Sequence, residues 1–71
     1  MIIKNGFTFT ITKNNYTGVV NSIDIANKIA HVAFFDNDGY LYLICDVYVD
    51  TIKNNLKTGA YKITEVQKWK D

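Results

Sequence analysis

The chain has 71 residues, of which 48% are hydrophobic and 14% aromatic, and its formal net charge is +1 at pH 7. This length predicts one domain, residues 1–71, and the small charge argues against a dedicated electrostatic clamp for nucleic acid. The single cysteine, Cys45, excludes an internal disulfide, and with the single histidine, His31, it supplies too few ligands for a structural zinc site.

Two strands are predicted in the first third of the chain. Phe and Ile alternate with Thr over residues 7–12, which is the period of a half-buried strand. Residues 13–15 predict a turn, because Asn tolerates positive φ. A second strand is predicted over residues 16–23, and Gly18 inside it indicates a bulge, a bend or a close approach. Residues 24–27 predict the next turn.

The central third of the chain predicts a β-hairpin. Strands over residues 28–35 and 40–46 flank Asp36-Asn37-Asp38-Gly39, which has the composition of a tight turn. If Asp36 lies opposite Gly39, alternate residues of both strands share one apolar face. The apolar pattern is expected to resist a slip of one residue, since a slip would mix the two faces. The expected core face contains Ala30, Val32, Phe34, Leu41, Leu43 and Cys45.

The region after the hairpin allows two interpretations, helix or loop. Residues 47–49 can continue a strand, after which Asp50 is expected to cap a helix of one or two turns over residues 51–57. Gly59 is a suitable residue to end that helix. A last strand is predicted over residues 60–66 with Ile63 facing inward, and Trp69 is expected to fold back onto the domain as a cap.

Five short strands with short connections bury both faces best as a small antiparallel barrel. The order of these elements resembles that of SH3-like barrels, including the helical turn before the last strand. Residues 18–24 (GVVNSID) and 28–34 (KIAHVAF) resemble the KOW-type half of such barrels, in which a glycine opens a strand that returns as an apolar strand. The chain departs from the KOW pattern in lacking a second, more N-terminal glycine and the basic residues of ribosomal members. RNA binding is therefore not inferred for this chain from its resemblance to KOW-type proteins.

The outer face of the hairpin is the candidate partner-binding surface. His31, Phe35, Tyr40 and Tyr42 are expected to lie together there, beside Ile44. A strand pair that is apolar on both faces needs a cover on each side. The cover can come from the rest of the barrel, from a second copy of the chain in a homodimer, or from a partner protein, because exposed aromatic patches mark interaction surfaces.

Positive charge gathers near the C-terminus. Residues 53–71 carry five Lys against two acidic residues, whereas residues 1–52 carry three Lys against five Asp. This segment is a solvated basic edge or a contact for phosphate or an acidic partner. The candidate contact residues are Lys53, Lys57, Lys62 and Lys68.

No residue pattern indicates catalysis, a metal site or a cofactor. His31 and Cys45 are expected on opposite faces of the hairpin, which prevents them from acting as a nucleophile and its base. Asp36-Asn37-Asp38-Gly39 lacks the further ligands of a calcium loop. The chain is therefore predicted not to be an enzyme.

The start of the chain lacks the apolar core of a signal peptide, and its longest apolar runs are too short to cross a bilayer. A cytoplasmic protein without membrane spans is expected, in line with a free cysteine. The predicted function is a non-enzymatic protein-interaction module. A phage or mobile-element accessory protein that binds or inhibits a host protein is a specific form of it. The alternatives are a nucleic-acid-binding small barrel that uses Lys and aromatic residues, and a structural homo-oligomer subunit.

Overall fold

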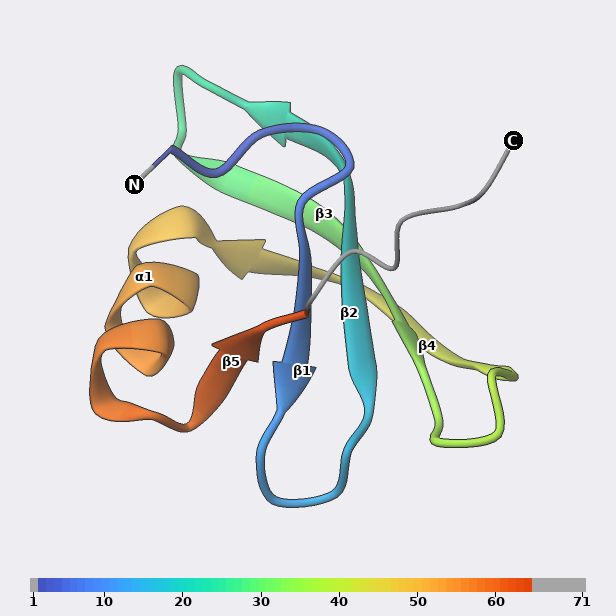
Figure 1. The fold of residues 1–71 in the computed structure, drawn as a ribbon. Helices are drawn as coiled ribbons and strands as arrows, with labels where there is room; N and C mark the ends of the chain where they lie inside the picture. Colours follow the sequence, from blue (N-terminus) through green and yellow to red (C-terminus); the bar gives the residue numbers. More distant parts are fainter. Residues whose placement is uncertain (1, 65–71) are drawn as a thin grey trace, which may run out of the picture.

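The computed structural model describes residues 2–64. Five antiparallel strands form one sheet in the order β4-β3-β2-β1-β5, with a helix between β4 and β5 (Figure 1). This confirms the predicted mostly β fold of five strands with one short helix before the last strand. The elements are β1 (Thr8–Ile11), β2 (Thr17–Asp24), β3 (Ile29–Phe35), β4 (Leu41–Tyr48), α1 (Val49–Thr58) and β5 (Tyr61–Ile63).

The sheet is open rather than closed into a barrel. Its two edges are β4 and β5, which are not paired with each other within residues 2–64. In the described part of the chain, the last strand pairs with β1 alone and covers residues 61–63, a part of the predicted 60–66. Residues 65–66 of that prediction, and the expected cap formed by Trp69, lie outside the described residues.

One face of the sheet carries the core, and we call it the inner face. Phe9, Val20 and Val32 project from three neighbouring strands of this face and are completely buried. Helix α1 adds Ile52, which is also completely buried, and so covers one end of the inner face. Burial of these apolar side chains supplies most of the stabilisation available to a chain without disulfides.

Gly18 marks a close approach, one of the three interpretations its position allowed. A Cβ atom at Gly18 would lie 2.3 Å from Cζ of Phe9, so the phenylalanine ring occupies the space that any other side chain would need. The bulge in β2 lies further along, between Val20 and Ser22.

The hairpin forms where it was predicted, but its expected register is wrong by two residues. Asp36 N donates to Tyr40 O (2.8 Å) and Gly39 N to Asp36 O (3.0 Å), with Gly39 at φ 89°. The loop therefore has three residues instead of two, which is a common hairpin geometry that needs a left-handed residue. A second residue is inserted at a bulge opposite Phe34 and Phe35, so Phe34 faces Leu43 rather than Leu41.

Because of the bulge, part of the expected core face is wrong. A slip of one residue, which the apolar pattern was expected to resist, does occur near the hairpin tip. Leu41 now pairs with Phe35, and cross-strand partners share a face, so Leu41 lies on the outer face. Leu43 stays on the inner face but is 48% exposed. Ala30, Val32 and Phe34 are buried as predicted. Cys45 is half-buried and opposite Val32.

Helix α1 is longer than expected and begins earlier. Tyr48, not Asp50, holds the N-cap position, and it makes no side-chain capping bond; Asp50 lies in the first turn instead. Val49 N donates to Lys28 O (2.9 Å), which anchors the start of the helix to the neighbouring turn. Gly59 ends the helix in the left-handed conformation (φ 88°), as predicted.

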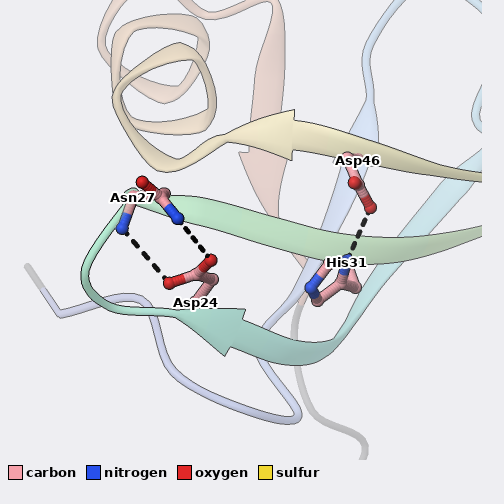
Figure 2. A network of polar contacts seen from close by, with 4 residues as sticks. All are labelled: Asp24, Asn27, His31 and Asp46. Atoms are coloured by element: carbon pink, nitrogen blue, oxygen red, sulfur yellow. Dashed lines mark hydrogen bonds and ion pairs between the residues drawn. The ribbon is translucent and has the colours of Figure 1, made fainter.

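The turn between β2 and β3 is held by a carboxylate. Asp24 accepts hydrogen bonds from the backbone N–H of Asn27 (3.2 Å) and from its side-chain amide (2.8 Å), as Figure 2 shows. These bonds, with the side-chain bond contributing most, hold the pKa of Asp24 below its ordinary value. The turn predicted at residues 24–27 is present one residue later, over residues 25–28.

Candidate functional site

The candidate site is a groove of about 300 Å³ on the inner face, at the end that α1 leaves uncovered. Its walls come from the β1–β2 hairpin, from β3 and β4, and from the start of β5. We call it the aromatic groove. Its lining residues are Ile11, Asn14, Tyr16, Phe34, Tyr42, Leu43, Cys45, Val47 and Tyr61.

Backbone pairing brings three tyrosines to this groove from distant parts of the chain. Ile11 pairs with Tyr61 of β5, and Ile11 N donates to Tyr16 O (2.8 Å) just before β2. The tips of the β1–β2 and β3–β4 hairpins point to the same end of the sheet (Figure 1), where the rings of Tyr16 and Tyr42 meet edge to face with centroids 5.1 Å apart. Edge-to-face contact is a favourable arrangement of two aromatic rings.

The chemistry of the aromatic groove is that of an apolar receptor. Among residues 2–64, the side chains that line it include no charged group, and the amide of Asn14 is its most polar one. The groove therefore suits apolar or aromatic groups of a ligand, while tyrosine hydroxyls can orient a polar atom beside them.

The four predicted partner-binding residues are not brought together as one patch. Tyr40 lies at the hairpin tip, 73% exposed, and Tyr42 turns to the aromatic groove because of the bulge. Phe35 is half-buried on the outer face opposite Leu41. His31, also on the outer face, bonds through Nδ1 to Asp46 (2.5 Å), as Figure 2 shows. His31 and Cys45 do lie on opposite faces, as expected, because they occupy adjacent rungs of the β3–β4 ladder.

The candidate phosphate contacts lie away from the aromatic groove. Lys53 and Lys57 are exposed on α1, and Lys62 is exposed on β5 opposite Thr10. Lys53 borders a separate hollow of about 260 Å³ together with Lys28 and Asp50, so an acidic group accompanies the two cations there. Lys68 lies outside the described residues.

Sequence reasoning missed Tyr16, Leu43 and Tyr61 as groove residues. Tyr61 stacks on Phe9 with ring centroids 4.6 Å apart, and from there it also reaches the groove. Tyr61 lies two positions before Ile63 in the predicted strand, so the two side chains share a face. Since Ile63 was expected to face inward, this spacing was a local signal that Tyr61 does too. No local signal showed that Tyr16, 45 positions earlier, lies on the same wall.

Neither a metal-binding cluster nor a membrane-spanning helix is present among residues 2–64. Within residues 2–64 there is no cluster of three or more His, Cys, Asp or Glu side chains that could hold a metal ion. The one helix over the same residues, α1, is neither long nor apolar enough to cross a bilayer.

No protein-family model matches the chain, and neither the curated proteins nor the solved structures contain a significant match. Its function is therefore argued from the geometry of its own surface.

Proposed function

We propose that this chain is a non-enzymatic protein-interaction module whose aromatic groove receives apolar side chains of a partner protein. The observation that carries the proposal is a run of exposed large apolar side chains along one arm of the β3–β4 hairpin, next to the groove. The run consists of Tyr40, Leu41, Tyr42, Leu43 and Ile44, each at least 48% exposed. Tyr42 and Leu43 of this run line the groove itself, and exposed apolar surface of this kind is typical of interaction sites.

The composition of the groove favours protein over nucleic acid. Tyrosine rings can stack on bases, but single-strand binders combine such rings with a positively charged channel for the backbone. The described lysines nearest in sequence to the groove residues, Lys13 beside Asn14 and Lys62 beside Tyr61, are not among its lining residues. Interfaces between proteins are instead enriched in Tyr, with charged residues depleted at their centre. A phage or mobile-element protein that binds a host protein is a particular case of the same proposal.

The test compares the wild-type chain with a double variant, Tyr42→Ser/Leu43→Ser, in affinity capture from lysate of the source cell. The matched control is Ile25→Ser, which removes an equally large side chain that is 84% exposed in the β2–β3 turn. Partners identified with the wild-type chain are then titrated with purified protein. We expect the double variant to lose roughly tenfold or more in affinity, since central aromatic and apolar contacts dominate interface energies, and Ile25→Ser to bind normally.

Two outcomes contradict the proposal. One is a partner that binds the double variant as tightly as the wild-type chain. The other is binding of single-stranded DNA or RNA at low salt that persists in the double variant and is lost in Lys53→Glu/Lys62→Glu, which would assign the nucleic-acid function instead. Circular dichroism spectra of all variants check that each remains folded.

A further inference from the structure

We propose that the edge of β4 that faces away from β3 pairs antiparallel with β4 of a second copy of this chain, around a two-fold axis at Ile44. This inference concerns the backbone at the edge of the sheet and does not depend on the aromatic groove. It gives the structural homo-oligomer, one of the alternative functions, a specific interface, namely β4 in the register centred on Ile44.

The first argument is that β4 presents unpaired backbone groups. β4 is an edge strand of eight residues, and among residues 2–64 its one neighbour is β3. Val49 N donates to Lys28 O (2.9 Å), and hydrogen-bonded and outward-facing residues alternate along an antiparallel strand. Counting back along the β3–β4 register from this bond, the N–H and C=O groups of Ile44, Asp46 and Tyr48 point away from β3.

The second argument is that this edge lacks most of the features that prevent strand pairing. Exposed edges are usually shortened, covered, or marked with Lys or Pro. β4 contains neither Lys nor Pro, and its bulge lies near the hairpin tip rather than at its centre. The opposite edge differs, because β5 has three residues with Lys62 in the middle. An edge as long and apolar as β4 is a template for another strand.

The third argument is that β4 is complementary to itself. Pairing about Ile44 places the outward-facing Ile44 opposite Ile44 of the second copy, and Asp46 level with the second copy's Tyr42, whose side chain the bulge turns to the other face. The single charged residue of β4 therefore does not meet its own copy, and it already bonds to His31. Ile44 is 63% exposed and extends the outer-face row of Val19 and Ala33. Two adjacent Ile44 side chains would shield each other from water.

The test is the mass of the purified full-length chain by sedimentation equilibrium over about a hundredfold range of concentration. We expect the mass to rise to about twice that of one chain and to stop there, because a two-fold interface closes. We expect Ile44→Lys to remain at the mass of one chain, while the matched control Ile25→Lys, in the exposed β2–β3 turn, still dimerises. Ile44→Pro is a second variant, which removes an outward N–H that β3 does not use.

A wild-type mass of one chain at every concentration overturns the proposal without reference to any variant. So does a dimer that survives in a folded Ile44→Lys chain. A mass that grows past two chains and falls on Lys62→Pro overturns it in favour of head-to-tail pairing of β4 with β5. Amide exchange checks the register, since Ile44 N–H should exchange more slowly at high than at low protein concentration. Partner capture and self-association are measured separately, so either can fail alone.

Discussion

Phe9 is the residue on which the inner face is organised. Its ring stacks on Tyr61, meets Phe34 edge to face with centroids 5.9 Å apart, and lies directly over Gly18. Three strands and the start of β5 therefore meet at one side chain. The Phe9 ring packs directly on the backbone of β2 at Gly18, where any side chain would collide with it. Glycine is needed for this reason, and not because the backbone requires an unusual φ angle there.

Gly18→Ala should destabilise the chain by about 1–3 kcal/mol, since an inserted methyl group forces neighbours out of place. Phe9 is the neighbour that must move, so Gly18→Ala should destabilise a chain that already carries Phe9→Leu by less than it destabilises the wild type. A double-mutant cycle of Gly18→Ala and Phe9→Leu, followed by urea unfolding, measures this coupling. Additive effects of the two substitutions would show that the strain arises elsewhere.

Asp24 gives the fold a small dependence on pH. Its pKa is lowered from 3.8 by the hydrogen bonds from Asn27, so its ionised form is favoured in the folded chain. A lowered folded pKa adds stability above the unfolded pKa, and this contribution is lost as the pH falls through the folded pKa. Asp24→Ala should therefore lower the urea midpoint at neutral pH, and the difference from wild type should shrink below about pH 3.8.

Asp38→Ala is the control for this pH dependence, since Asp38 also lies in an exposed turn. A difference between wild type and Asp24→Ala that stays constant from neutral to acidic pH would exclude a contribution from ionisation. It would leave the packing of the turn as the cause of the stability loss.

At the scale of elements, α1 stabilises the sheet chiefly through Ile52, its one fully buried residue, with Val49 and Leu56 partly buried against the same core. Ile52 is fully buried among core side chains of the inner face, whereas Lys53 beside it is exposed. Ile52→Ala should cost about 2–5 kcal/mol of unfolding free energy through lost burial and the cavity left behind. Lys53→Ala should change it by less than about 0.5 kcal/mol. A small loss for Ile52→Ala would mean that the sheet is stable without α1.

The β3–β4 hairpin shows how two small backbone features change a surface. A loop with one extra residue and a bulge at Tyr42 together shift the pairing by two residues. The shift preserves the faces along most of the strands, but the bulge exchanges them at the tip. Leu41 thereby joins the outer face, and Tyr42 joins the aromatic groove. The hairpin residues stayed adjacent as predicted, while the composition of the candidate site changed.

At the scale of the whole molecule, both proposals arise because the sheet stays open. A closed barrel has no edge strands and fills its interior with side chains. Here the inner face is filled at one end by Ile52 and its neighbours and is hollow at the other. Within residues 2–64, the open sheet also leaves the outward backbone groups of β4 without a neighbouring strand. The groove is an apolar hollow and the edge is a row of backbone groups, and Tyr42 of β4 belongs to both.

The sequence by itself determined where the strands lie, though not where each one ends, because alternation of Phe and Thr around Phe9 and the turn residues before Gly39 act over a few positions. It also indicated the helix stop at Gly59. Tertiary structure alone decided the strand register, the length of α1, and the meeting of Tyr16, Tyr42 and Tyr61 at one groove. Periodicity assigns a side chain to a face, but a single bulge or an added loop residue reverses or shifts that assignment. Whether distant strands then close a barrel or leave an edge depends on the pairing of the whole sheet.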